Sequence, residues 1–367
     1  MQFEEPLFNI HLNVDYPFNL TGILYFPKIS NDINMQKDKI QLYQNQVFVT
    51  DNVEGIVPEF LTLLRGVIDS PDIPLNVSRS YLQADGAVKK ISNYITRKVA
   101  DKLSSLYKKD RKGFEEKWND IKVVIEYGML SEDKFFEKAQ KFALYPTVNN
   151  DYFTFDELKD KISKTQTDKD GNLVILYTSN VNEQHSYVES AKAKGYEVLL
   201  LDSPIISHLI QKIETSNEKL NFTRVDSDVI EKLIKKDEKE VSKLDDKEKE
   251  RLKTIIEEVV PKEKYTVQIE ATDSSSPPFV ITVPEFMRRM KEMQQSGGNG
   301  MFGNMPEMYN LNINVNNPIC SEILNCKGKA KKERLINQSL DLAKLSQNLL
   351  KGEELTSFIK RSLDLIK

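Results

Sequence analysis

The chain has 367 residues, of which 39% are hydrophobic and 29% are charged, and its formal net charge is −4. At roughly 100–200 residues per domain, this length predicts about two or three domains, and the composition excludes a disordered chain or an integral membrane protein. Lys and Arg (52) nearly balance Asp and Glu (56), so neither nucleic acid nor acidic lipid is an expected partner.

The apolar runs, the start of the chain and the cysteines bear on localisation. Runs such as Val198 to Leu201 are strand-sized and far shorter than the ~20 residues of a membrane-spanning helix. The first residues, MQFEE, show no basic start and no apolar stretch, so no signal peptide is expected. Two cysteines, Cys320 and Cys326, cannot make a disulfide framework, which favours a reducing cytoplasm.

The first third of the chain predicts a sheet followed by helices. Hydrophobic residues alternate with polar ones over 8–14, and 20–26 and 40–49 are two further strand-like stretches. From Ile56 to Val67 the hydrophobic residues fall at helical spacing, which predicts a helix. Longer helical patterns follow at about 78–107 and 131–144.

A compact α/β unit is predicted next. A buried-type strand at 173–177 is followed by a helix at 183–194 and a second strand at 196–201, and another helix follows Pro204. This order favours parallel strands with a right-handed crossover. One interpretation is a self-contained α/β enzyme with its site near the 173–201 strands, since ligands bind at the carboxyl ends of such strands.

The usual catalytic signatures do not support that enzyme. The sequence has no Walker-type phosphate loop, no His-Glu-x-x-His, no Gly-x-Ser-x-Gly and no paired Cys-x-x-Cys. The histidines His11, His185 and His208 are widely scattered, so no metal site is expected.

The sharpest change in composition lies at 235–253, where fifteen of nineteen residues are charged. The mixture of both signs predicts a solvated helical connector, with a domain boundary just before or within it. Beyond it, 265–269 and 279–283 resemble strands, and 331–350 and 355–366 resemble helices.

Arg79 and Gln83 form the first candidate site. Asn76 or Ser78 is a suitable N-cap for a helix, which would place Arg79 in the first turn, where the helix dipole disfavours a cation. Gln83, four residues on, shares its face. An ordinary surface arginine is the simpler interpretation, and a pair that meets a phosphate held by another domain is the functional one.

A methionine-rich helix is the second candidate site. Six of the nine methionines lie between 287 and 308, and a stripe at helical spacing comprises Phe286, Met287, Met290 and Met293. Core packing and a surface that binds varied apolar partners are both compatible with this pattern.

The two terminal helices carry apolar stripes that predict dimerisation. Helices at a chain end have few local elements to cover such stripes, and a four-helix bundle from two chains would bury them. The residues concerned are Leu342, Leu345, Leu349, Leu355, Phe358, Ile359, Leu363 and Ile366.

Several segments resemble the heat-shock-protein-90 chaperone family, in particular its bacterial members. The resemblance is strongest in the block 59–79, which includes DIPLNVSR, and extends to NLTGILYFP at 19–27 and GYEVLLL at 195–201. DSSSPP at 273–278 and the helical region 345–358 are similar to the C-terminal domain of the family. The resemblance therefore covers nearly the whole chain, more loosely after about residue 225.

This resemblance implies an α/β and α+β multidomain fold. A middle domain over 1–225 would have two α/β sandwiches joined by helices: a large α/β part at about 1–130, a helical connector at 131–168 and a small α/β part at 169–225. A mixed α/β C-terminal domain would follow over 226–367 and end in a dimerising helical bundle.

The resemblance also implies functional roles. The N-terminal domain of the family, which binds ATP and Mg, has no counterpart among these residues, so no cofactor and no ATP hydrolysis are expected of this portion alone. Arg79 matches the arginine that reaches the γ-phosphate in that domain, and Gln83 matches the glutamine beside it; Ser80 stands where the family often has an acidic residue. The methionine-rich helix matches a segment that contacts non-native client proteins, and the last helices match the bundle of a homodimeric, ATP-driven clamp. The chain end, DLIK, lacks the acidic peptide with which eukaryotic cytosolic members recruit co-chaperones.

Overall fold

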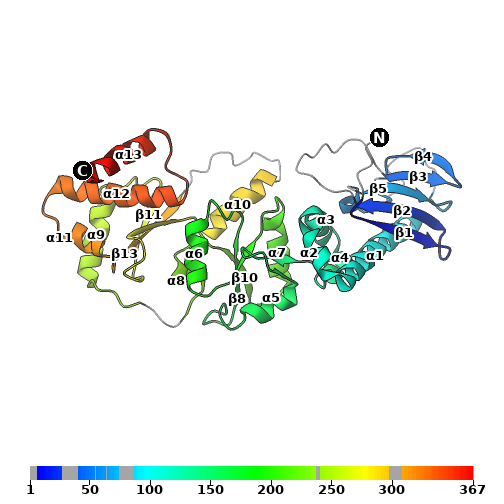
Figure 1. Cartoon of the computed structure of the whole chain (residues 1–367), viewed down its shortest axis with the longest axis horizontal. Coiled ribbons are helices and arrows are strands. Elements are labelled where there is room, and N and C mark those ends of the chain that lie inside the picture. The colour runs from blue at the N-terminus through cyan, green and yellow to red at the C-terminus, as the bar shows by residue number, and fades with distance from the viewer. Residues whose placement is uncertain are drawn as a thin grey trace. The chain divides into compact units, whose positions relative to one another are not determined.

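The computed structural model describes residues 6–26, 40–53, 55–62, 64–73, 86–236, 240–296 and 308–366. It divides into two compact units, Met1–Tyr145 with Tyr152–Leu158 and Pro146–Asp151 with Lys159–Lys367. The colours in Figure 1 follow the chain through both. The predicted boundary between residues 225 and 226 falls inside the second unit and stays a prediction.

The first unit contains a five-stranded sheet in the order β1-β2-β5-β3-β4. Its strands are β1 (Phe8–Val14), β2 (Leu20–Phe26), β3 (Ile40–Gln44), β4 (Val47–Thr50) and β5 (Arg65–Asp69). All neighbours are antiparallel except β3 and β5, which are parallel. The predicted stretch 40–49 is two strands, because Asn45 and Gln46 both have positive φ (50° and 66°) and make the tight turn of a hairpin.

Helices complete this unit: α1 (Gly86–Lys109), α2 (Arg111–Glu116), α3 (Trp118–Ser131) and α4 (Asp133–Ala139). Helix α1 packs against β1. There the hydroxyl of Tyr94 donates a hydrogen bond to the carbonyl of Asn13 (3.1 Å), and its ring meets that of Phe18 edge-on at 5.6 Å. The short strands β6 (Tyr145–Pro146) and β7 (Tyr152–Phe153) and helix α5 (Phe155–Ile162) follow.

The predicted helix at 56–67 is wrong. The described residues of this segment form a 3-10 turn, η1 (Glu59–Leu61), and the chain then enters β5. Gly66 explains why a strand fits here: it pairs with Leu24 of β2, its φ is +147°, and a Cβ atom would lie 2.1 Å from the carbonyl oxygen of Ile23. Glycine therefore permits the close approach of the two backbones.

The second unit begins with a parallel three-stranded sheet in the order β10-β8-β9. Its strands are β8 (Leu173–Thr178), β9 (Val198–Leu200) and β10 (Leu220–Arg224), and its helices are α6 (His185–Ala193), α7 (Ile206–Ser216) and α8 (Ile230–Leu233). The predicted strand–helix–strand unit with parallel pairing is confirmed, and β10 extends the sheet beyond the prediction. We call residues 159–236 the small α/β part.

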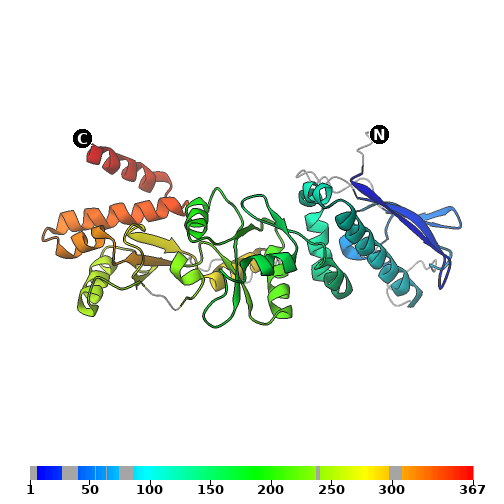
Figure 2. The same cartoon turned by 60° about the horizontal axis from the view of Figure 1, so that its bottom comes forward.

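A second sheet, with the order β11-β13-β12, forms the C-terminal part. Its strands are β11 (Tyr265–Glu270), β12 (Phe279–Thr282) and β13 (Tyr309–Asn314). The helices described in this stretch of the chain are α9 (Asp246–Glu257), α10 (Glu285–Ser296), α11 (Pro318–Asn325), α12 (Lys329–Ser346) and α13 (Gly352–Ile366). Helix α12 lies along this sheet in both views (Figures 1 and 2).

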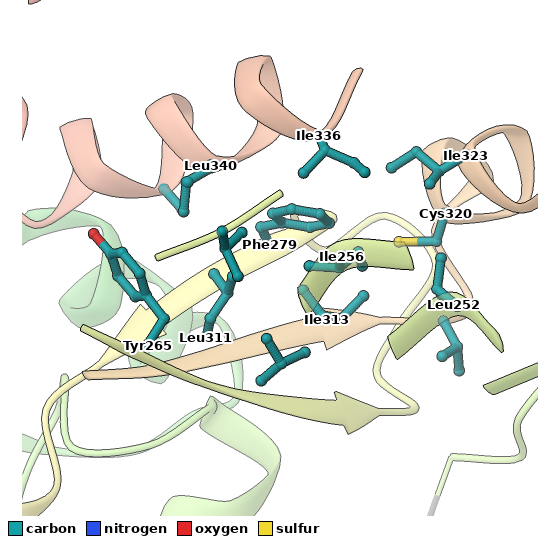
Figure 3. Close-up of a cluster of buried hydrophobic side chains, with 14 of the residues drawn as sticks. Leu252, Ile256, Tyr265, Phe279, Leu311, Ile313, Cys320, Ile323, Ile336 and Leu340 are labelled. Atoms are coloured by element: carbon teal, nitrogen blue, oxygen red, sulfur yellow. The ribbon is translucent and has the colours of Figure 1, made fainter. Parts of the chain in front are cut away.

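The core of the C-terminal part shows that the charged stretch 235–253 is not a solvated connector throughout. Asp245 caps helix α9 in a capping box with Glu248, and Leu252 and Ile256 of that helix are fully buried. They pack with residues of the sheet and of α11 and α12, including Phe279, which lies at the centre of Figure 3. The charged residues of α9 thus cover the outside of a core helix.

The two units together confirm the expected α/β and α+β multidomain fold. Among the described residues, no helix is both long enough and apolar enough to cross a membrane.

We expect Gly66→Ala to destabilise the first unit by about 2–4 kcal/mol, because the new Cβ would meet a backbone carbonyl at a φ that side chains rarely adopt. Gly86→Ala is the matched control, since a Cβ there meets nothing within 4 Å. Urea unfolding followed by the fluorescence of Trp118, the single tryptophan of the chain, measures both. Equal midpoints for the two variants would contradict this account of the β2–β5 contact.

Candidate functional site

Arg79 and Gln83, the predicted phosphate-contacting pair, lie outside the described residues. Helix α1 is described from Gly86 onward. The predicted role of this pair stays a prediction.

Helix α10, the methionine-rich helix, lies between β12 and β13 in the chain but packs against α7 of the small α/β part. It is the yellow helix labelled α10 in Figure 1. The residues against which α10 packs are therefore distant from it in the sequence.

Glu285, the first residue of α10, accepts hydrogen bonds from three elements. Its Oε1 accepts from the hydroxyl of Tyr177 on β8 (3.2 Å), from Nε of Arg289 (2.7 Å) and from the guanidinium of Arg288. Its Oε2 accepts from the backbone N–H of Arg224 on β10 (3.3 Å). Arg288 also donates to Tyr177, so that these groups form one connected network.

A second carboxylate extends this network to α7. Glu214 receives both terminal nitrogens of Arg289, at 2.6 and 3.1 Å, in the bidentate geometry that suits a guanidinium. The same Glu214 accepts the backbone N–H of Phe222 (2.6 Å), and Arg289 donates to the carbonyl of Phe222 (2.5 Å). We call Glu285, Arg288, Arg289, Tyr177 and Glu214 the docking network.

Burial and charge shape the ionisation of this network. Burial alone would raise the pKa of Glu285, but Arg288 and Arg289 outweigh it and lower that pKa. Burial opposes the charge of Arg289 as well, yet Glu214 and Glu285 raise its pKa. Burial is the main cause that raises the pKa of Tyr177, and the negative charge of Glu285 raises it further. These shifts favour the charged forms of Glu285 and Arg289 and the neutral form of Tyr177.

Phe286 of the apolar stripe of α10 faces away from the docking side of the helix. Phe286 is 73% exposed, and Met287 and Met290 are half-buried. The side chain of Met293 lies outside the described residues. Because Arg288 is 7% exposed, the charged face of the helix is the one that packs, and Phe286 is not a core residue.

The docking network also occupies the edge of the sheet where an α/β enzyme would bind a ligand. Tyr177 and Arg224 stand at the carboxyl ends of β8 and β10, and both contact Glu285. No group of three or more His, Cys, Asp or Glu suited to a metal ion occurs within the described part of the chain.

The terminal helices leave much of their predicted stripe exposed. Leu342 and Leu345 on α12 are 47% and 44% exposed, and Ile359 and Leu363 on α13 are 49% and 54% exposed. Leu355 and Phe358 are half-buried, and the side chain of Ile366 lies outside the described residues. Leu349 packs against the core of the C-terminal part, so in the described structure its role is at least partly internal.

Polar contacts hold α13 on α12. Arg361 pairs with Asp341, Gln338 donates to the hydroxyl of Ser362 (3.2 Å), and Lys344 pairs with Glu354 (3.2 Å). These contacts leave Leu342, Leu345, Ile359 and Leu363 exposed on the two helices.

Sequence reasoning did not identify the docking network. A glutamate at a helix start with arginines three and four residues later is a detectable signal for local ion pairs. The partners Tyr177 and Glu214 lie 108 and 75 residues from the α10 residues that they contact, so no local pattern reveals them.

Comparisons with known proteins define the family. Residues 1–357 match the family described as Hsp90 protein. The chain is 46% identical to Chaperone protein HtpG of Bacteroides thetaiotaomicron, over 99% of this chain and 63% of that protein. It is 49% identical to Chaperone protein HtpG of Porphyromonas gingivalis, over 93% of this chain and 51% of that protein. The chain therefore belongs to the Hsp90 family, and it spans less than two thirds of the length of these relatives.

The lowered pKa of Glu285 predicts acid sensitivity of the second unit. Because the folded pKa lies below the ordinary value of 4.5, the carboxylate stabilises the fold above about pH 4.5 and loses this effect as the pH falls through the folded value. We expect Glu285→Gln to destabilise the second unit by about 3 kcal/mol at pH 7, since Arg288 loses its carboxylate, and by less at pH 3.5.

Urea unfolding followed by circular dichroism measures this difference, with Trp118 fluorescence reporting the first unit separately. If Glu285→Gln lowers the free energy of unfolding of the second unit by the same amount at pH 7 and at pH 3.5, ionised Glu285 does not stabilise the unit.

Proposed function

We propose that the chain is the middle and C-terminal portion of an ATP-dependent molecular chaperone of the cytoplasm, which binds non-native proteins as a homodimeric clamp. Membership of the Hsp90 family supports this, as do relatives named chaperone proteins. In the whole protein, ATP and Mg would bind to an N-terminal domain in the same chain. The portion itself would contribute the client-binding surface, the dimer interface and Arg79.

The observation that carries the proposal is the direction in which α10 docks. A helix with an apolar stripe normally buries that stripe, whereas α10 buries Arg288 (7% exposed) and leaves Phe286 73% exposed, with Met287 and Met290 half-buried. Methionines beside an exposed phenylalanine make an adaptable apolar surface, which suits partners of varied sequence. Non-native proteins expose such apolar segments.

The alternative, a self-contained α/β enzyme with its site near the 173–201 strands, has less support. The edge where its ligand would bind is where Tyr177 and Arg224 contact Glu285. There the hydroxyl of Tyr177 and the backbone N–H of Arg224 donate to the carboxylate of Glu285 and thereby dock helix α10.

A second copy of the chain is the proposed partner of α12 and α13. Exposed apolar residues on both helices, Leu342, Leu345, Ile359 and Leu363, would be covered in a four-helix bundle of two chains. Leu355, Phe358 and Ile366 belong to the same proposed surface.

Arg79, with Gln83 beside it, is the proposed contribution to ATP hydrolysis. A guanidinium brought to the γ-phosphate across a domain interface would stabilise the charge of the transition state. This portion alone would not hydrolyse ATP, because the nucleotide would be held elsewhere in the whole protein.

For client binding, we expect Phe286→Ser combined with Met290→Ser to weaken suppression of the aggregation of an unfolded protein. Because Phe286 is 73% exposed and Met290 is half-buried, the two substitutions remove limited buried area, and the melting temperature should fall by no more than about 4 °C. Lys291→Gln, on the same helix and exposed, is the matched control. A large fall in melting temperature with unchanged suppression would return the stripe to the core.

For assembly, we expect Ile359→Lys with Leu363→Lys, or deletion of 353–367, to yield monomers in light scattering. Both side chains are about half exposed in the single chain, so the double substitution should leave the fold intact by circular dichroism. Lys360→Ala is the control on the same helix. A dimer that persists in both variants would place the interface elsewhere.

For catalysis, we expect Arg79→Ala in the whole protein to reduce ATP turnover by roughly 10³-fold, as the loss of an arginine finger does elsewhere. ATP affinity should survive, because the pocket belongs to another domain. Gln83→Ala should act in the same direction but less, since an amide carries no charge. Near-normal turnover of the arginine variant would remove Arg79 from the mechanism.

A further inference from the structure

Helix α10 lies between two strands of the C-terminal sheet in the sequence, but it contacts the small α/β part. It lies between β12 and β13 of the C-terminal sheet, but its buried side chains meet β8, β10 and α7 of the small α/β part. These contacts fix which face of α10 points toward the small α/β part and which face points away from it.

Glu285 is the centre of these contacts. It accepts from Arg288 and Arg289 of its own helix and from Tyr177 and Arg224 of two strands. A buried ion pair often contributes little net stability, because desolvation offsets the attraction. Its hydrogen bonds are directional, however, and Arg289 is held by two carboxylates at once, Glu285 and Glu214.

The geometry of a helix turns this contact into an orientation. Successive side chains differ by about 100° around the helix axis, so holding residues 285, 288 and 289 inward directs residues 286 and 290 outward. The 73% exposure of Phe286 beside the 7% exposure of Arg288 agrees with this, and Met290 is half-buried.

We propose that Glu285 is a positioning residue for the client-binding surface: it fixes the rotation of α10 about its axis and thereby presents the apolar stripe in advance of binding. This inference rests on the proposed function. A surface that is already ordered binds more tightly than one that becomes ordered on contact, because no further conformational entropy is lost on binding.

The test compares Glu285→Gln with the unchanged 367-residue chain. Glutamine keeps the shape of the side chain and removes the charge that Arg288 and Arg289 share. Hydrogen exchange of the α10 amides should become at least ten-fold faster. The Kd for carboxymethylated α-lactalbumin, a permanently unfolded probe, should rise about five- to ten-fold. Unchanged exchange in α10 together with an unchanged Kd would overturn the proposal.

Phe286→Ser separates this inference from the proposed function. It should raise the Kd while leaving exchange in α10 as it was, because the residue is exposed. If Phe286→Ser leaves the Kd unchanged, the surface itself does not bind the probe, and the proposed function fails. If Phe286→Ser raises the Kd and Glu285→Gln does not, the surface stands and the positioning role is refuted.

A double variant distinguishes positioning from stability. Glu285→Gln with Arg288→Met removes both charges, so no buried charge is left unpaired and the melting temperature should recover. The Kd should remain raised, because the contacts that set the rotation are still missing. Recovery of both the melting temperature and the Kd would assign Glu285 a purely structural role and overturn the proposal.

A second variant serves if Glu285→Gln does not fold. Glu214→Gln loosens Arg289 from α7, so it should also make exchange in α10 faster and raise the Kd. No change in either would refute the proposal.

Discussion

The carboxylate of Glu285 decides which face of helix α10 remains available to a partner. It joins two arginines of its own helix to Tyr177 and to the backbone of Arg224. A buried guanidinium group without an acceptor is strongly destabilising, so Arg288 and Arg289 can face inward because this carboxylate accepts their hydrogen bonds. The exposed position of Phe286 is the consequence, and the proposed recognition of non-native proteins depends on it.

Strand β12 connects the rest of the second unit to this helix. Val280 packs against the hydrophobic cluster of the small α/β part, whereas Ile281 belongs to the core of the C-terminal part. The carbonyl of Ile281 accepts hydrogen bonds from the hydroxyl of Tyr187 (2.7 Å) and from Nε2 of Gln347 (2.8 Å). The small α/β part, the C-terminal sheet and the loop between α12 and α13 therefore meet at one polar junction, which explains why they form a single compact unit.

Local patterns predicted what local forces determine. The period-two alternation of β1 and the strand–helix–strand order at 173–201 are confirmed, because each reflects burial of one face of one element. The helical spacing of 56–67 predicts a helix. The close backbone contact of Gly66 with a distant strand instead makes the end of this segment, from Arg65, an extended strand. Leu252 of the charged stretch is buried for a similar reason: its core partners lie on other elements. The apolar stripe of α10 was visible in the sequence, but its outward direction depends on Tyr177, 108 residues before Glu285.

The most direct test of the account labels the methionine methyl groups of the 367-residue chain with ¹³C and adds an unfolded protein. We predict that the resonances of Met287 and Met290 shift, because these half-buried side chains lie within one helical turn of the exposed Phe286. Met129, which is 1% exposed in the core of the first unit, should not shift and serves as the internal reference. Binding of the unfolded protein with no change at Met287 and Met290 would contradict the claim that this face of α10 recognises non-native proteins.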